Sequence, residues 1–198
     1  MTTTIFLVRH GIHDQLQGRL CGRAAGVRLG EAGLAQADAA GRRLTGEGVE
    51  VVLTSPLERT RQTAERIAHA CGVPMRIEEA LMEIDFGDWN GRTFDSLRDD
   101  PLWAVWNSDR DTARPPSGES MAEVQARLGG WLVRVSGAGP KAVAAVSHGD
   151  VIKAAVGLAT GLTMKSHDRL EISPGSITTL VAGDGFLKLH ALNEVPHA

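Results

Sequence analysis

The sequence predicts an α/β fold with a mainly parallel β-sheet. Two observations indicate this. Apolar runs of strand length alternate with longer patterns of helical length, as in chains of βαβ units. The composition, 42% hydrophobic and 23% charged, is that of an ordinary globular protein, and 198 residues are enough to bury a substantial core. We therefore expect a single domain over residues 1–198.

The predicted strands are short apolar runs and the predicted helices are longer amphipathic segments. Strands are expected at 4–8, 49–55, 74–81 and 141–150, with a C-terminal hairpin of 176–181 and 186–192 around a turn at 182–185. Helices are expected at 29–48, 55–72, 118–135 and 150–161. In the second helix, Ser55 is expected as the N-cap, Pro56 as the first helical residue and Gly72 as the residue after the end.

A less regular segment at about 86–118 interrupts the alternation. It contains three of the four tryptophans, Trp89, Trp103 and Trp106, and three of the eight prolines. We expect an excursion from the sheet and not a second domain. Its tryptophans either line a cap over a substrate or pack in the core or in an interface.

Charge and cysteine content argue against several partners and locations. A net charge of −3 gives no reason to expect nucleic acid or an anionic membrane as a partner. Cys71 falls on the apolar stripe of a predicted helix, so a buried free thiol is expected in preference to a disulfide with Cys21. Without a signal-peptide pattern or an apolar stretch of membrane-spanning length, we expect a cytoplasmic protein. The oligomeric state is left open, with a homodimer among the options.

Two of the predicted strands end in the same way. The first is followed by Arg9-His10-Gly11, and the run at 141–147 is followed by His148-Gly149. Ligands of parallel sheets bind at the carboxyl ends of the strands, so both imidazoles share one crevice if the two strands are neighbours. The two glycines let backbone N–H groups approach an anion closely.

Further charged residues are expected near the same edge of the sheet. Arg59 lies in the first turns of the helix after the second strand, where the helix dipole favours an anion. A carboxylate follows the third strand, and spacing alone does not choose among Glu83, Asp85 and Asp88.

These residue types suit phosphoryl transfer without a metal or another cofactor. Arginine binds phosphate oxygens through paired donors. A neutral imidazole can attack phosphorus and carry the phosphoryl group, while a second, protonated imidazole stabilises charge on the oxygens. A protonated carboxylic acid can give its proton to the leaving alcohol and then act as a base on water.

The chain also carries a series of motifs: LVRHG (7–11), TSPLERTRQTA (54–64), LMEIDFGDWNG (81–91), PSGES (116–120) and SHGDVIK (147–153). In these motifs and their order it resembles the histidine phosphatase superfamily, the phosphoglycerate-mutase-like enzymes. The resemblance implies a three-layer α/β/α sandwich on a mostly parallel sheet, with no metal. It implies His10 as the phosphorylated nucleophile, Arg9 and Arg59 as phosphate ligands, His148 as the second imidazole and Glu83 as the proton donor.

The segment after Arg-His-Gly departs from the family pattern. Many relatives continue with Glu, then Thr or Ser, and have an Asn a few residues later, whereas this chain continues with Ile12-His13. Ile12 cannot make the polar contact of the family residue. Either Gln17 or His13 is expected to replace the phosphate contact of the Asn.

The loop that follows contains three arginines, which either reach a second anionic group of the substrate or are solvated: Arg19, Arg23 and Arg28. The predicted substrate-binding residues are Arg9, Gly11, Gln17, Arg23, Arg59 and Gly149.

The predicted function is a phosphomonoesterase that acts on a small phosphorylated metabolite through a phosphohistidine, similar in length and motifs to the α-ribazole phosphatases. The alternative is a phosphoglycerate-type mutase on the same pocket. A mutase needs a tighter lid against water, and little chain follows the last predicted strand to form one. A silent binding domain, suggested only by Ile12, and a metallohydrolase using His10, His13, His148 and Asp150 are less favoured.

Overall fold

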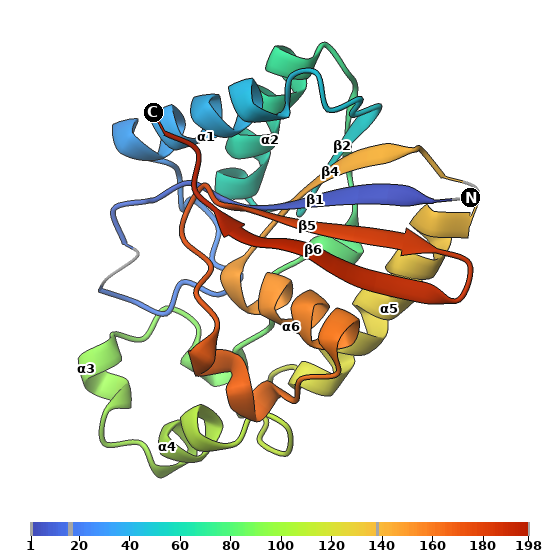
Figure 1. The fold of residues 1–198 in the computed structure, drawn as a ribbon. Helices are drawn as coiled ribbons and strands as arrows, with labels where there is room; N and C mark the ends of the chain where they lie inside the picture. Colours follow the sequence, from blue (N-terminus) through green and yellow to red (C-terminus); the bar gives the residue numbers. More distant parts are fainter. Residues whose placement is uncertain (1, 16–17, 138, 198) are drawn as a thin grey trace.

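A six-stranded sheet forms the centre of the molecule, and it confirms the predicted α/β class (Figure 1). The computed structural model describes residues 2–15, 18–137 and 139–197. The strands are β1 (Thr3–Arg9), β2 (Val51–Thr54), β3 (Met75–Ile77), β4 (Ala142–Ser147), β5 (Ile177–Gly183) and β6 (Phe186–Glu194). Their order is β3-β2-β4-β1-β5-β6. Strands β3, β2, β4 and β1 are parallel to one another. Strand β5 is antiparallel to β1, and β5 and β6 form the expected antiparallel hairpin.

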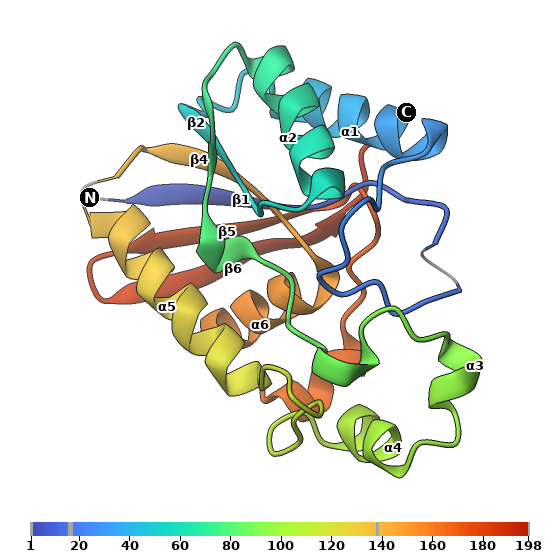
Figure 2. The same ribbon diagram turned by 180° about the vertical axis from the view of Figure 1, so that it is seen from behind.

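Helices cover both faces of the sheet and make three layers. The long helices are α1 (Glu31–Leu44), α2 (Glu58–Cys71), α5 (Met121–Gly137) and α6 (Gly149–Thr160). Figures 1 and 2 show α1 and α2 on one face and α5 and α6 on the other. No helix in the described part of the chain has the length and hydropathy needed to cross a membrane.

Strand β1 shows why both faces are covered. Successive side chains of a strand point to opposite faces. Ile5 and Leu7 belong to the core cluster that includes residues of α5 and α6, whereas Phe6 and Val8 belong to the cluster that includes residues of α1 and α2. All four side chains are at most 4% exposed. A continuous apolar strand therefore requires a helix layer on each side.

The segment at 86–118 is an excursion that packs its tryptophans into the core. It contains a 3-10 helix, η2 (Gly87–Trp89), and the helices α3 (Phe94–Leu97) and α4 (Pro101–Ser108). Trp89 and Trp106 are at most 1% exposed, and Trp103 packs against the same cluster. The Nε1–H of Trp89 donates to Asp100 at 3.1 Å. The core interpretation is thus confirmed for Trp89 and Trp106, whereas Trp103 is half-buried at the edge of the cluster.

The second helix begins later than predicted. α2 begins at Glu58, and its N-cap is Leu57, which makes no side-chain capping bond. Ser55 is fully buried at the end of β2, and its Oγ lies 2.9 Å from Nε2 of His148. Because the hydroxyl of Ser55 is hydrogen-bonded to His148, it does not cap the helix.

Other boundaries also differ from the prediction. The strand predicted at 74–81 ends at Ile77, because Glu78 accepts a bond from the N–H of Ala80 and starts a 3-10 helix, η1 (Glu79–Leu81). A further 3-10 helix, η3 (Met164–Arg169), was not expected. Cys71 is a free thiol as expected, but it is half-buried and not buried.

The register of the parallel strands aligns their carboxyl ends. β4 lies between β1 and β2, with Arg9 paired to Ser147 and Thr54 paired to Val146. The residue that follows each strand therefore emerges at the same edge of the sheet.

Two glycines let the loop after β1 pack directly on the start of α1. A Cβ on Gly33 would lie 2.1 Å from the carbonyl oxygen of Ile12, and one on Gly11 would lie 2.3 Å from the carbonyl oxygen of Gly33. Because the opposing atoms are backbone, they cannot move aside independently.

We predict that Gly33→Ala lowers the free energy of unfolding by about 1–3 kcal/mol, the usual cost of overpacking. Urea denaturation measures it. Gly129→Ala in α5 is the control, because among the described residues no atom beyond its own helix and chain neighbours lies within 4 Å of the added Cβ. This control should gain up to about 1 kcal/mol from helix propensity. An equal gain for both variants would contradict the close backbone contact.

Candidate active site

Three residues that directly follow parallel strands meet at the carboxyl edge of the sheet. His10 follows β1, Ser55 follows β2 and His148 follows β4. The ring centroids of His10 and His148 are 5.2 Å apart, and both rings are at most 3% exposed. The two strands with His-Gly ends are therefore neighbours, as expected, and their imidazoles lie side by side. His10 lines the cavity at this edge of the sheet, and His148 is fully buried next to it.

The surroundings of His10 hold it as a neutral imidazole with its lone pair on Nε2. Nδ1 lies 2.8 Å from the carbonyl oxygen of Gly11, so Nδ1 carries the hydrogen and donates it. Nε2 accepts from Nε of Arg59 at 3.3 Å. Burial holds the pKa of His10 well below its usual range, and the positive charges of Arg59 and Arg9 add to this.

Both arginines that were expected to bind phosphate lie in this pocket with donors unused. Nη2 of Arg59 donates to the carbonyl oxygen of Gly22 at 2.7 Å, and Nη1 of Arg9 donates to that of Ile172 at 2.5 Å. Nη1 of Arg59 and Nε of Arg9 are buried without a partner among the described residues. Buried donors are normally satisfied, so these two are available to an anionic ligand.

His148 is fixed between a hydroxyl and a guanidinium. Its Nδ1 lies 3.2 Å from Nη2 of Arg59, which can only donate, so Nδ1 is the acceptor and Nε2–H points to Oγ of Ser55. Burial and the charge of Arg59 hold the pKa of His148 well below its usual range. This differs from the protonated second imidazole expected from the sequence, because a ring buried beside an arginine resists a second positive charge.

Of the three candidate carboxylates Glu83, Asp85 and Asp88, it is Glu83 that lines the pocket, where Asp150 from the first turn of α6 joins it. Oε2 of Glu83 lies 3.6 Å from Nδ1 of His148, and the Glu83 side chain is 13% exposed. Burial, followed by the negative charge of Asp150, raises the pKa of Glu83 to about 7, against the opposing effect of Arg59. Asp85 and Asp88 do not line the pocket. Glu83 thus keeps its proton to a higher pH than an exposed carboxyl does.

The pocket is a cavity of about 190 Å³ with a lining that is partly charged and partly apolar. Its lining includes the apolar side chains of Leu20, Phe86 and Phe94 together with Arg19. A larger cavity of about 350 Å³, between α5, α6 and the β5–β6 hairpin, is lined without any titratable side chain. Another cavity, of about 360 Å³, contains charged side chains, but its arginine, Arg43, is already paired with Glu47 and Glu194. The cavity of His10 is the one in which buried arginine donors without a partner in the described part of the chain lie beside an imidazole.

Several predicted substrate-binding residues lie elsewhere or are already engaged. Gly149 lines the pocket, but Gly11 does not, and its N–H donates to Oγ1 of Thr63 at 3.2 Å. Arg23 also does not line the pocket, because its guanidinium is held by carboxylates, including Glu119 at 3.0 Å. Gln17 lies outside the described residues.

Sequence reasoning missed Ser55 and Thr63, and His13 was only an alternative. Ser55 orients His148, and Thr63 links α2 to the loop of His10. The sequence held one signal for each of them: Ser55 directly follows β2, and Thr63 lies one helical turn after Arg59. His13 lines the pocket with its ring centroid 5.4 Å from that of His10, and its buried Nδ1 has no partner among the described residues. Burial lowers the pKa of His13 to about 4, so it is neutral.

The metallohydrolase alternative requires a group of ligands. Within residues 2–15, 18–137 and 139–197, no three His, Cys, Asp or Glu side chains are grouped so that they could hold a metal ion.

Comparison with known proteins relates this geometry to one family. The model of the histidine phosphatase superfamily (branch 1) matches residues 5–195. A probable phosphoglycerate mutase GpmB of Yersinia pestis (strain Pestoides F) is 31% identical over 182 residues, which cover 88% of this chain and 82% of the relative.

Several solved structures have the same fold as this chain over nearly its whole length. A putative α-ribazole-5'-P phosphatase from Escherichia coli has a TM-score of 0.85 at 25% identity, covering 99% of this chain and 98% of its own. A mycobacterial glucosyl-3-phosphoglycerate phosphatase has a TM-score of 0.84 at 25% identity, covering 98% of this chain and 100% of its own. The chain is an enzyme of the histidine phosphatase superfamily.

Proposed function

We propose that this enzyme hydrolyses a small phosphate monoester through a phosphohistidine at His10, without a metal. One observation carries the proposal: the lone pair of a neutral, buried imidazole shares a pocket with two arginines whose unused donors suit a phosphate group. A phosphate dianion placed there satisfies those donors and lies next to the nucleophile.

In the first half-reaction, Nε2 of His10 attacks phosphorus and the bond from phosphorus to the ester oxygen breaks in line. Arg9 and Arg59 bind the phosphoryl oxygens and balance their charge. The protonated carboxyl of Glu83 gives its proton to the departing alkoxide, which leaves as an alcohol.

In the second half-reaction, the carboxylate of Glu83 removes a proton from water as the water oxygen attacks phosphorus. The bond between phosphorus and Nε2 breaks, which releases inorganic phosphate and restores the neutral imidazole. A carboxyl with a pKa of about 7 suits both steps, because it gives up and regains its proton near neutral pH.

The role of His148 follows from the charge that the substrate brings. Nδ1 of His148 accepts from Arg59 and lies 3.6 Å from Oε2 of Glu83, and both of these residues line the pocket. A phosphate dianion favours uptake of a proton from solvent at this nitrogen. Nδ1 then gives up the bond that it accepted from Arg59 and donates to an oxygen of the transferring group, to which the released N–H of Arg59 can also donate. Ser55 keeps the ring in the required orientation.

The relatives support hydrolysis but leave a second candidate. Two similar structures are a putative α-ribazole-5'-P phosphatase and a glucosyl-3-phosphoglycerate phosphatase, which favours a phosphorylated metabolite as substrate. The similarity to a probable phosphoglycerate mutase favours mutase activity as the alternative. Conversion of 3-phosphoglycerate after priming with bisphosphoglycerate, without net phosphate release, would favour the mutase.

We predict that His10→Ala abolishes phosphate release from a panel of monoesters that includes p-nitrophenyl phosphate and 3-phosphoglycerate, because the nucleophile is gone. Phosphate release is measured after treatment with a chelator, which the wild-type activity should survive. His190→Ala, an exposed histidine on β6, is the control and should retain full activity. Turnover by a folded His10→Ala protein would disprove the proposal.

We predict that Glu83→Gln reduces kcat/KM for alkyl phosphates by about 10²–10⁴-fold and affects p-nitrophenyl phosphate far less, because only a poor leaving group needs the proton. For alkyl esters, the wild-type value should fall above about pH 7, where Glu83 becomes ionised. This decline should be absent in Glu83→Gln. Equal losses for both ester types would exclude Glu83 as the acid.

A further inference from the structure

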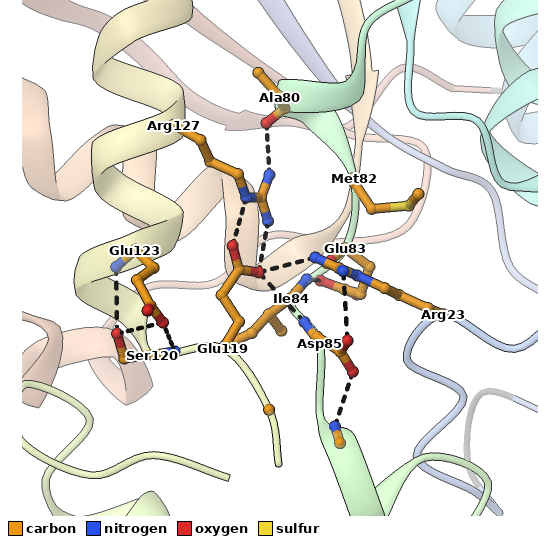
Figure 3. Close-up of polar contacts among 12 residues, drawn as sticks. Arg23, Ala80, Met82, Glu83, Ile84, Asp85, Glu119, Ser120, Glu123 and Arg127 are labelled. Carbon is orange, nitrogen blue, oxygen red and sulfur yellow. Dashed lines mark hydrogen bonds and ion pairs between the residues drawn. The ribbon is translucent and has the colours of Figure 1, made fainter.

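A cluster of four charged side chains lies beside the segment that carries Glu83 (Figure 3), and none of the four lines the pocket. We call it the Glu119 cluster, and its members are Arg23, Asp85, Glu119 and Arg127. The carboxylate of Glu119 accepts from Arg23 at 3.0 Å and from Nε and Nη2 of Arg127 at 2.8 and 3.2 Å. Arg23 also pairs with Asp85 at 3.4 Å. Glu119 is therefore the shared partner of two arginines from distant parts of the chain.

The cluster holds the backbone that carries Glu83. Nε of Arg23 donates to the carbonyl oxygen of Glu83 at 2.7 Å, and Nη1 of Arg127 donates to that of Ala80 at 2.6 Å. The N–H of Asp85 donates to Glu119 at 3.3 Å, and the N–H of Glu119 donates to the carbonyl oxygen of Asp85 at 2.8 Å. These bonds fix the chain before, at and after Glu83.

The held segment has no regular structure of its own. Residues 82–86 lie between η1 and η2 and belong to no helix or strand. A catalytic side chain on such a segment depends on contacts from outside to set its position. Here these contacts come from the loop after β1, through Arg23, and from α5, through Arg127.

The Glu119 cluster affects the position of Glu83 more than its protonation state. The main effects on the pKa of Glu83 come from burial, from Asp150 and from Arg59, none of which belongs to the cluster. The bonds from the cluster reach the backbone around Glu83 and leave its carboxyl group free to face His148.

We infer that Glu119 is a positioning residue, which with Arg23 and Arg127 sets the carboxyl of Glu83 at the leaving-group side of the pocket. The inference rests on the proposed role of Glu83 as the acid. It also explains why Arg23, expected to bind substrate, is turned away from the cavity.

The test compares Glu119→Gln with wild type on an alkyl phosphate and on p-nitrophenyl phosphate. A displaced acid harms only the ester that needs its proton, and a misplacement of about 1 Å can cost about 10²-fold. We expect kcat/KM to fall about ten- to hundredfold for the alkyl ester and to change much less for the aryl ester. A general loss of structure would lower both values together.

Glu123→Gln is the matched control, because Glu123 lies in the first turn of α5, pairs with Arg114 and Ser120, and makes no hydrogen bond to residues 80–85 among the described contacts (Figure 3). It should behave as wild type on both esters. If Glu119→Gln does not fold, Arg127→Lys replaces it, since lysine keeps the charge but lacks the fork that bonds both Glu119 and Ala80.

Glu83→Gln, measured in parallel, separates the two claims. If it shows the ester-dependent loss but Glu119→Gln or its replacement shows equal losses or none, the positioning role is wrong while the acid role stands. If Glu83→Gln itself shows no difference between the esters, the acid role and the inference built on it are both overturned.

Discussion

The buried guanidinium of Arg59 is the group on which the rest of the site depends. It is 2% exposed and lies between two buried imidazoles, donating to Nε2 of His10 and to Nδ1 of His148. Because arginine only donates, each of these ring nitrogens must present a lone pair. The position of Arg59 thus fixes the tautomers of both histidines and, with burial, keeps both rings neutral.

Burial shifts the pKa of acidic and of basic groups in this pocket in opposite directions. Removal from water disfavours the charged form of any group, so it lowers the pKa of the imidazoles and raises that of Glu83. One poorly solvated pocket therefore supplies a neutral nucleophile and a protonated acid together near neutral pH. Burial alone therefore shifts the pKa of each residue in the direction that its role requires.

Much of the fold and of the site could be predicted because it follows from local patterns. The apolar run of β1 specifies a strand buried on both faces, and two strands that end in His-Gly in a parallel sheet specify where His10 and His148 emerge. The choice of Glu83 over Asp85 and Asp88 needed the family resemblance, because all three lie within six residues on an irregular segment. Only the tertiary structure separates Glu83, whose carboxyl lies beside His148, from Asp85, whose carboxyl is bonded to Gly87, Asn90 and Arg23.

The errors also have a physical pattern. Ser55 has the sequence context of a helix cap, but a long-range contact with His148 outweighs the local preference. Arg23 has the context of an anion ligand, but carboxylates far away in the sequence bind it first. In both cases a polar side chain found a partner that only the fold brings close, and no pattern within the local sequence contains that information.

In the proposed mechanism, Nε2 of His10 carries the phosphoryl group during turnover. The most direct measurement is rapid mixing with a labelled phosphate ester, quenching in alkali, in which phosphohistidine is stable, and location of the label by mass spectrometry and NMR. We expect a phosphoryl group on Nε2 of His10 that forms and decays as fast as product appears, since Nδ1 is held by Gly11. Turnover with no label, or with the label on Nδ1 or on His148, would contradict the account.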